Sequence, residues 1–374
     1  MRRSQRRRLD PARLDGAAFA TPAPGQSVSR QARFETVPFH TTEEEPRELN
    51  LKHLLPGSTA PGEGPVLLIG GTSVRADIFS PPTEDTLPEF LARAGYDVWI
   101  LNWRASIDFA PSEYHLDDAA VYDHPAAVRT VLERTGAETL KAVVHCQGST
   151  SFMMSIVSGL LPEVTTVVSN SVALHPQLTS LSFLKLPLAV ATFGKVMPYF
   201  NPQWGLHAPG FWPKVFDWAV RATHHECNNA VCKHSSFTYG SAFPTLWSHE
   251  NLDEATHEWI KGEFGFVPVT FFAQMAECAA AGHLVTMGNY PDVLPSDLFA
   301  QDPQTDARFA FMTGDQNNTF LPSGMAKTFD YFERIAPGRH VFQQMHGYGH
   351  LDVFLGRHAA RDVFPFILDE LNRG

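Results

Sequence analysis

The chain of 374 residues predicts an α/β fold with a mostly parallel, doubly wound sheet and an inserted, mainly helical cap. Three observations lead to this class. Short continuous apolar runs, typical of strands buried on both faces, alternate with segments of helical spacing. Repeated strand and helix units predict a parallel sheet with helices on both faces. Over 175–306 this alternation stops, which predicts an insertion.

Composition and charge restrict the class of protein. Hydrophobic residues make up 44% of the chain and charged residues 18%, which excludes intrinsic disorder and allows a sizeable core. A net charge of −11 argues against nucleic acid and anionic membranes as general partners. The apolar runs fall short of the ~20 residues that a membrane span requires. The 4 cysteines are too few for a disulfide scaffold and favour a reducing, cytoplasmic location.

The first segments predict a tail followed by a hairpin. Residues 1–30 combine an arginine-rich start with Pro, Ala, Gly and Asp, and the apolar stretch of a signal peptide is missing. We therefore expect a mobile basic tail there rather than an export signal. The alternating segments 31–42 and 48–55, separated by an acidic turn, predict an antiparallel edge hairpin.

The core follows from the order of buried strands and helices. Strands are predicted at 65–69, 97–103, 140–145, 164–172, 308–313 and 339–345. Helices are predicted at 86–94, 117–135, 147–160, 323–335 and 351–371. We therefore assign 31–174 and 307–374 to the sheet-containing core, and 175–306 to the cap.

The segment 143–149, which reads VVHCQGS, joins a buried strand directly to a helix. This is the frame of a nucleophile elbow, whose strained turn lifts the corner residue above the sheet. The corner residue is Cys146, and the N–H of Gln147 would point at the same space as one oxyanion donor. Gly148 fits the need for a small residue, whereas Val144 is bulkier than the usual glycine. The alternative is that Cys146 is a buried core thiol.

Two residues near the C-terminal end of the sequence complete a possible triad. On this kind of sheet the acid follows a late strand and the histidine lies in the loop after the last strand. Asp315 and His350 occupy these places, with Asp352 and His346 as the nearest substitutes. Because Cys146 would lie at a helix N-terminus beside an imidazole, we expect its thiolate to be stabilised.

The loop after the first buried strand contains a glycine pair at 70–71, which would let the backbone approach a substrate oxygen closely. Thr72 is the expected second oxyanion donor, and a simple tight turn is the alternative. Further contacts to substrate are expected from Gly71, His145, Tyr348 and Trp247. Because the cap is rich in Trp and Phe, we expect a large apolar substrate rather than a sugar or nucleotide.

The frame 65–374 resembles the α/β-hydrolase superfamily and, more narrowly, the hydrolase-like regions joined to GMC-type (cholesterol-oxidase-like) flavin oxidoreductases. The motifs that carry this resemblance are VHCQGS at 144–149, Cys227-x4-Cys232 followed by Tyr239-Gly240, ATH at 255–257, FG at 264–265 and GYGHLDVF at 347–354. The elbow cysteine is also similar to dienelactone hydrolases and polyhydroxyalkanoate synthases, which use a Cys-His-Asp triad.

The resemblance implies roles for three residues: Cys146 as nucleophile, Asp315 as orienting acid and His350 as base. It also implies a GMC-type oxidoreductase or an acyl carrier as partner. The chain departs from the pattern in having Gly70 where many relatives carry His. It lacks a flavin-binding motif, so we expect no cofactor.

These residues together predict a hydrolase of a carboxylic ester, lactone or thioester that forms an acyl-thioester on Cys146. One alternative is an acyltransferase, in which an alcohol or amine takes the place of water. A second alternative is a binding module in which Cys146 is catalytically idle.

The cap segment 224–234 places Cys227 and Cys232 among several histidines. Zinc takes Cys and His ligands, but structural sites combine one closely spaced pair with a second pair. The sequence shows no second pair beside this one, so we expect no metal. We expect the two thiols to pack together and His257 to be a polar residue of the cap.

Overall fold

The computed structural model describes residues 33–55, 62–241 and 243–374. The tail predicted at 1–30 lies outside these residues. Within the described ranges, none of the helices has both the length and the apolar character that crossing a membrane requires.

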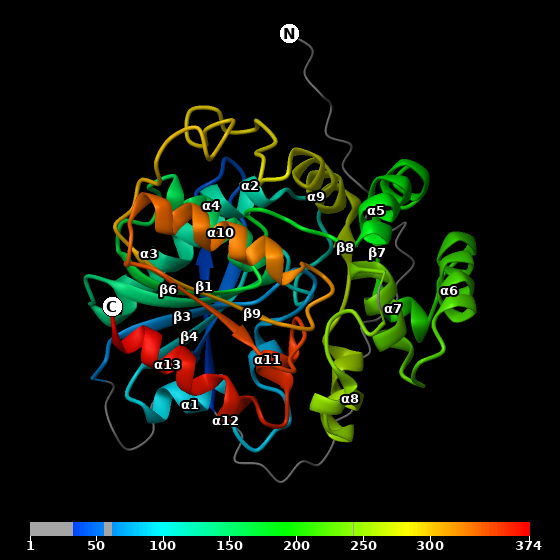
Figure 1. Cartoon of the computed structure of the whole chain (residues 1–374), viewed down its shortest axis with the longest axis horizontal. Coiled ribbons are helices and arrows are strands. Elements are labelled where there is room, and N and C mark those ends of the chain that lie inside the picture. Colours follow the sequence, from blue (N-terminus) through cyan, green and yellow to red (C-terminus); the bar gives the residue numbers. More distant parts are fainter. Residues whose placement is uncertain (1–32, 56–61, 242) are drawn as a thin grey trace.

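The centre of the molecule is a sheet of eight strands in the order β1-β2-β4-β3-β5-β6-β9-β10 (Figure 1). Neighbours from β4 to β10 pair in parallel, whereas β1 and β2 pair antiparallel with each other and β2 pairs antiparallel with β4. This topology confirms the predicted fold class and the edge hairpin. The strands are β1 (Phe34–His40), β2 (Glu48–Leu54), β3 (Pro65–Ile69), β4 (Asp97–Asn102), β5 (Leu140–His145), β6 (Val164–Asn170), β9 (Arg308–Gly314) and β10 (Val341–Met345).

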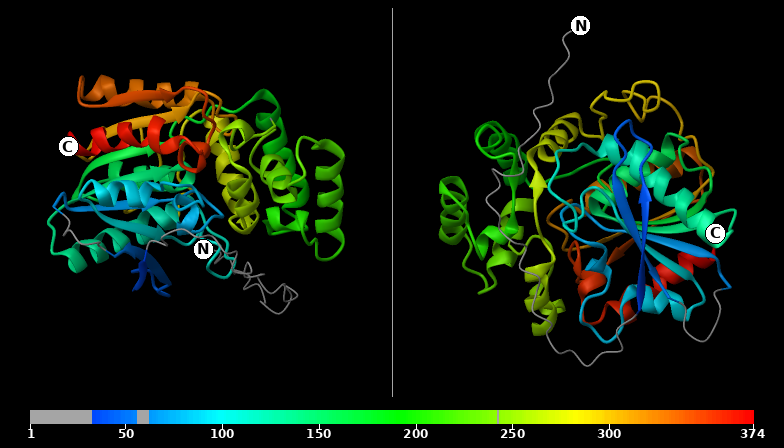
Figure 2. Two further views of the ribbon diagram at one scale, coloured as in Figure 1. Left: turned by 90° about the horizontal axis from the view of Figure 1, so that it is seen from below. Right: turned by 180° about the vertical axis from the view of Figure 1, so that it is seen from behind.

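Helices cover both faces of the sheet and enclose two hydrophobic cores (Figure 2). The alternation of side chains along β3 divides it between them: Leu67 and Ile69 pack in one core, Val66 and Leu68 in the other. This is why the strand reads as a continuous apolar run. The first core is covered by α3 (His124–Thr135), α4 (Cys146–Val157) and α10 (Pro322–Ile335), and the second by α1 (Leu87–Arg93) and α13 (Phe364–Asn372).

Two predicted helices differ from those observed. The helix expected at 117–135 contains a π-helical turn, and runs as α2 (Leu116–Asp118), η3 (Ala119–Asp123) and α3. The single helix expected at 351–371 is wrong, because it is divided into α11 (Asp352–Leu355), α12 (Ala359–Asp362) and α13. Gly356 takes an extended backbone that ends α11, and a proline lies in the first turn of α13, where its missing N–H costs nothing.

The segment between β6 and β9 forms a mainly helical layer beside the sheet (Figures 1 and 2). A short antiparallel pair, β7 and β8, lies within it and was not expected from the sequence. The elements of this cap are α5 (Ser180–Phe193), β7 (Tyr199–Phe200), η4 (Pro202–Gly205), α6 (Phe211–Thr223), α7 (Ala230–Tyr239), η5 (His249–Asn251), α8 (Glu254–Trp259), η6 (Ile260–Gly262), β8 (Val267–Pro268) and α9 (Val269–Ala281).

A buried ion pair joins the loop after β4 to the π-helical turn. The Arg104 guanidinium contacts both carboxylate oxygens of Asp123, with Nη2 to Oδ1 at 2.6 Å, and the Arg104 N–H donates to Oδ2 at 2.9 Å. The two side chains are 2% and 0% exposed. Charges removed from water to this extent are tolerated because each has its partner.

We expect Asp123→Ala to lower the free energy of unfolding by about 3 kcal/mol, because it leaves the buried Arg104 charge with only the partly exposed Glu43 carboxylate, 3.3 Å from Nη2. Urea denaturation followed by circular dichroism measures the effect. The control is Asp85→Ala, since the pair of Asp85 with Arg93 lies in solvent with side chains 42% and 55% exposed and should be worth less than about 1 kcal/mol. Equal losses in the two variants would contradict this interpretation.

Candidate active site

The turn between β5 and α4 has the geometry of a nucleophile elbow. Cys146 has a φ of 55°, in the left-handed region that a residue with a Cβ adopts at a cost of ~1–3 kcal/mol. A Cβ added to Gly148 would overlap the carbonyl oxygen of Gly70 and come within 2.8 Å of Ile69 Cγ2. The helix therefore crosses the loop after β3 so closely that only glycine fits at this position.

The loop after β10 brings His350 to the elbow. The Cys146 Sγ and one ring nitrogen from each of His145 and His350 all lie within 4.8 Å of one another. The rings of His145 and His350 have centroids 4.7 Å apart. His350 is 1% exposed, and neither of its ring nitrogens has a hydrogen-bond partner within the described part of the chain. The structure thus places a thiol and an imidazole together.

Asn170, at the end of β6, joins the strand end to both histidines. Its Nδ2 donates to His145 Nδ1 at 2.7 Å and to the backbone carbonyl of His350 at 3.2 Å. The side chain is fully buried. Sequence reasoning missed Asn170, although a polar residue that ends an otherwise apolar strand marks the edge where sites of parallel sheets form.

Asp315 does not reach the His350 ring, which corrects the expected pairing. The Asp315 carboxylate binds His346 Nδ1 at 2.6 Å and the N–H of Gly347 at 2.9 Å. The register explains this, because Met345 pairs with Gly314 and the next residues on the two strands, His346 and Asp315, therefore meet. His346, the alternative base, has a side chain that is 99% exposed, and it is not among the residues grouped around the Cys146 thiol.

Asp352, the alternative acid, fastens the cap to the histidine loop. Its carboxylate accepts hydrogen bonds from the N–H groups of Ser248 and Gly349 at 3.1 and 2.8 Å, and from Asn251 Nδ2 at 2.7 Å. Burial raises the pKa of Asp352 to about 6. These contacts hold a cap segment against the loop that ends in His350.

Burial keeps the thiol and the imidazole neutral. It raises the pKa of Cys146 to about 12, although the N–H of Gln147 opposes this rise, and it lowers the pKa of His350 to about 3. The expected stabilisation of the thiolate is therefore not found in the resting protein. The cost of removing a charge from water exceeds what the helix N-terminus supplies here.

The expected oxyanion donors lie beside the thiol. Gln147 and Thr72 both line the cavity with Cys146, and Gln147 stands in the first turn of α4, where backbone N–H groups have no partner within the helix. A Cβ on Gly71 would be 3.1 Å from the Cys146 Cβ, so this glycine lets the loop approach the Cys146 side chain. The Thr72 hydroxyl is hydrogen-bonded to the Tyr114 hydroxyl, which fixes the loop.

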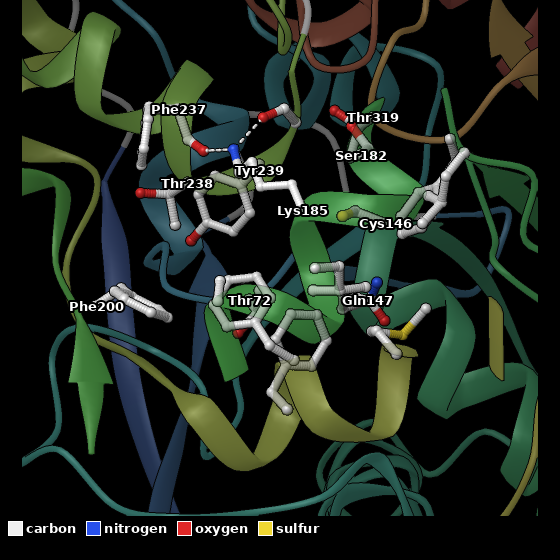
Figure 3. A pocket seen from close by; sticks show the side chains of 18 of the residues that line it. Thr72, Cys146, Gln147, Ser182, Lys185, Phe200, Phe237, Thr238, Tyr239 and Thr319 are labelled. Atoms are coloured by element: carbon white, nitrogen blue, oxygen red, sulfur yellow. Dashed lines mark hydrogen bonds between the residues drawn. The ribbon is translucent and has the colours of Figure 1, made fainter. Parts of the chain in front are cut away.

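An apolar cavity opens at Cys146 between the core and the cap (Figure 3). It encloses about 800 Å³ of empty space, counting the part open to solvent. Most of its wall comes from aromatic and aliphatic side chains of α5, β7, α6, α7 and α9, including Phe200, Phe216, Phe237, Phe271, Phe272 and Met275. The site is therefore shaped to receive an apolar group next to the thiol.

Lys185 projects into this cavity from α5 and was not predicted from the sequence (Figure 3). Its Nζ donates to the carbonyl oxygens of Phe237 and Gly240 and lies 4.3 Å from the centre of the Phe237 ring. Burial lowers the pKa of this amine to about 8. A signal was available, since Lys185 is the only charged residue in the apolar helix α5.

Two of the residues expected at the substrate lie elsewhere. The Tyr348 hydroxyl donates to Asp362 Oδ2 at 3.0 Å, and Tyr348 is not among the residues that line the cavity. Trp247 is buried against Phe264, with ring centroids 5.8 Å apart. Of the four contacts expected from the sequence, Gly71 and His145 are the two that the fold brings to Cys146.

The described residues contain a second cluster of metal-binding side chains besides His145, Cys146 and His350. The ligand atoms of Cys227, Cys232, His249 and His257 all lie within 4.8 Å of one another. The expectation of no metal rested on a missing second ligand pair, and His249 and His257 supply that pair. Sequence spacing did not reveal it because His249 and His257 come from two further segments of the cap.

The chain is similar in sequence to known lipases over part of its length. No family model matches the chain. It is 30% identical over 220 residues to lipase member K of Homo sapiens, which covers 53% of this chain and 52% of the relative. It is 35% identical over 115 residues to lysosomal acid lipase/cholesteryl ester hydrolase of Rattus norvegicus, or 28% of each chain. The chain thus matches about half of the length of the first relative and less of the second.

A solved lipase structure in an open form superposes on this chain with a TM-score of 0.55 at 13% identity. The superposition covers 91% of this chain and 99% of the lipase chain. This likeness, together with the parallel sheet and its flanking helices, shows the α/β-hydrolase fold.

We expect Gly148→Ala to displace α4 from the loop after β3, because the new methyl group would overlap backbone atoms that cannot rotate away. The variant should lose about 2–4 kcal/mol of unfolding free energy. Gly62→Ala is the control, since a Cβ there meets nothing within 4 Å. Thermal unfolding measures both, and a Gly148→Ala protein as stable as Gly62→Ala would refute the close crossing.

Proposed function

We propose that this protein hydrolyses carboxylic esters, lactones or thioesters of large apolar acids through an acyl-thioester on Cys146. The observation that carries the proposal is the strained elbow, which presents the Cys146 thiol to an apolar cavity beside the buried imidazole of His350. The similarity to lipases supports ester hydrolysis.

In the proposed mechanism the proton leaves the thiol as the sulfur attacks the carbonyl carbon. His350 accepts this proton, and the N–H groups of Gln147 and Thr72 stabilise the negative charge on the substrate oxygen. The tetrahedral intermediate collapses to the acyl-thioester, and His350 returns the proton to the leaving alcohol or thiol. Water, deprotonated by His350, then attacks the thioester. His350 returns this proton to the leaving Cys146 sulfur, which releases the acid and restores the free thiol. Both partners begin neutral because both are buried.

Asp315 and Asn170 act in this proposal as positioning residues. Asp315 holds the start of the histidine loop through His346 and the Gly347 N–H. Asn170 holds its end through the His350 carbonyl. The imidazole is thereby fixed at its backbone on two sides, rather than by a carboxylate on its ring.

The chemistry of the cavity wall points to the substrate class. Phenylalanine, leucine and methionine side chains bury an acyl chain or ring favourably, whereas a sugar would lose its hydrogen bonds to water there. The similarity to a lysosomal acid lipase/cholesteryl ester hydrolase supports an apolar ester in the same way. The acyl group would lie among α5, α6 and α9, with its carbonyl at Cys146.

Cys146→Ala should reduce hydrolysis of long-chain p-nitrophenyl esters and acyl thioesters by at least about 10³-fold, because it removes the nucleophile. Cys278→Ala is the matched control: Cys278 is also a buried thiol whose pKa burial raises to about 12, but it lies in α9 outside the reacting group. Intact-mass spectrometry during turnover should show the acyl group on the wild-type and Cys278→Ala chains and not on Cys146→Ala.

The same experiment separates the alternatives. Unchanged turnover in Cys146→Ala would remove the thiol from the mechanism, and a wild-type chain inert toward every ester would favour the binding module. An acyltransferase would form an ester or amide faster than free acid when an alcohol or amine is added. An acyl carrier or a GMC-type oxidoreductase as the natural partner stays a prediction from the sequence.

The low pKa of His350 predicts an unusual acid limb of activity. A base with a pKa of about 3 stays unprotonated from neutral pH down to about pH 4. We expect kcat/KM at pH 5 to remain within about twofold of its value at pH 7, whereas a base at the ordinary histidine pKa would lose about 25-fold.

Initial rates from pH 4 to 8 test this expectation. The protein also becomes less stable at low pH. An unfolded histidine binds a proton below about pH 6.5, whereas native His350 does not. The contribution of His350 to the free energy of unfolding is therefore lost as the pH falls from about 6.5 toward the native pKa of His350. Circular dichroism at each pH must therefore show a folded chain. An acid limb centred near pH 6.5 in folded protein would contradict the buried neutral base.

A further inference from the structure

Three segments of the cap meet at a cluster of two cysteines and two histidines. Cys227 precedes α7, Cys232 lies in its first turn, His249 lies in η5 and His257 in α8. One ligand atom from each residue lies within 4.8 Å of every other. Cys232 is buried and the other three are partly buried, so the cluster is shielded from bulk water without being closed to it.

We propose that this cluster binds one zinc ion in a tetrahedral site that holds the cap together. Two thiolates and two imidazoles form one of the standard ligand sets of structural zinc. In such a site, bond lengths near 2.3 Å to sulfur and 2.0 Å to nitrogen put the ligand atoms about 3.3–3.8 Å apart. The Cys232 Sγ and the His249 Nε2 are already 3.3 Å apart.

One ring nitrogen of the cluster lacks the partner that a metal-free interior would need. His257 Nε2 is buried without a hydrogen-bond partner among the described residues. Cys227 and Cys232 are free thiols rather than a disulfide. A buried nitrogen lone pair left unpaired costs ~1–3 kcal/mol, and a metal ion removes that cost.

Asn229 preorganises the ligands from outside the cluster. Its Oδ1 accepts the N–H of Cys232 at 3.0 Å and so caps α7, while its Nδ2 donates to the carbonyl of His257. The Asn229 side chain thereby links the backbone of Cys232 to the backbone of His257. Supporting contacts of this kind are typical of metal sites, where they fix the ligands before the ion arrives.

Binding balances in charge and needs no redox partner. Zn²⁺ replaces the two thiol protons, which leave to solvent, and the neutral imidazole nitrogens of His249 and His257 donate lone pairs. The two thiolates neutralise the ion, so the closed site carries no net charge. With four protein ligands, no position stays open for a reacting water, which makes the site structural rather than catalytic.

The position of the cluster connects the ion to the loop that carries His350 and to the wall of the cavity. His249 belongs to a segment whose neighbours bind the histidine loop: Leu246 O accepts the N–H of Leu351 at 2.8 Å, and Asn251 Nδ2 donates to Gly347 O at 2.8 Å. The ion would fix this segment to α7, and α7 forms part of the cavity wall. Any effect on hydrolysis rests on the proposed function, whereas metal binding does not.

Metal analysis of the full-length protein, purified without chelators, tests the proposal. We expect about one zinc ion per chain by inductively coupled plasma mass spectrometry, and loss of most of it in Cys227→Ser and in His257→Ala. His225→Ala and Cys278→Ser are the matched controls, because His225 is exposed outside the ligand set and Cys278 lies in α9; both should keep the ion. Cys146→Ala should also keep it, which separates this site from the His145, Cys146 and His350 group.

A second measurement uses wild-type protein alone, so it does not depend on whether the variants fold. Wild-type protein stripped with a chelator and titrated with Co²⁺ should develop the visible bands of tetrahedral cobalt and a thiolate charge-transfer band, saturating at one ion per chain, and its Tm should rise on adding Zn²⁺.

The proposal is overturned by wild-type protein that contains no zinc and gives no tetrahedral Co²⁺ spectrum, by a Cys227–Cys232 disulfide in freshly purified protein, or by zinc that is lost only in Cys146→Ala. Zinc present at one ion per chain in a protein that hydrolyses no ester would retain this site and reject the proposed function.

Discussion

The close crossing of α4 over the loop after β3 is the constraint on which the candidate site depends. Gly148 packs against the backbone of Gly70, so the helix starts almost in contact with that loop. Cys146, at the turn from β5 into this helix, adopts a left-handed backbone. The same approach puts Gly71 against the thiol and Thr72 beside the cavity. The strained backbone at Cys146 thus presents its thiol to the cavity, next to the loop that we propose binds the oxyanion.

Burial then determines the kind of chemistry that this geometry can support. The thiol and the imidazole lie together in surroundings that disfavour charge on either, so the pKa of Cys146 rises and that of His350 falls. A resting thiolate–imidazolium pair is therefore unfavourable, and charge would develop only as the bond to substrate forms. Donors already directed at the developing charge are worth most in such a dry site. The apolar cavity and the neutral dyad are consequences of the same exclusion of water.

The cap contributes more than a cover. Asp352 gathers three hydrogen bonds at the junction of the cap and the histidine loop, and Asn251 contributes one of them while also binding Gly347. The segment that carries His249 is thus tied to the loop that carries His350. A contact network of this kind couples the order of the cap to the placement of the imidazole, although the two lie far apart in the sequence.

The sequence by itself determined the parallel sheet, the edge hairpin and the elbow, because these are encoded by local signals: apolar runs, turn residues and a glycine two positions after Cys146. It also placed Asp315 and His350 on the correct loops. Only the tertiary structure decided which side chains meet there. The register of β9 and β10 places Asp315 beside His346, and the loop after β10 buries His350 beside Cys146. His249 and His257 reach the cysteine pair for the same reason: contacts between distant segments depend on how whole elements pack, and spacing along the chain does not record that.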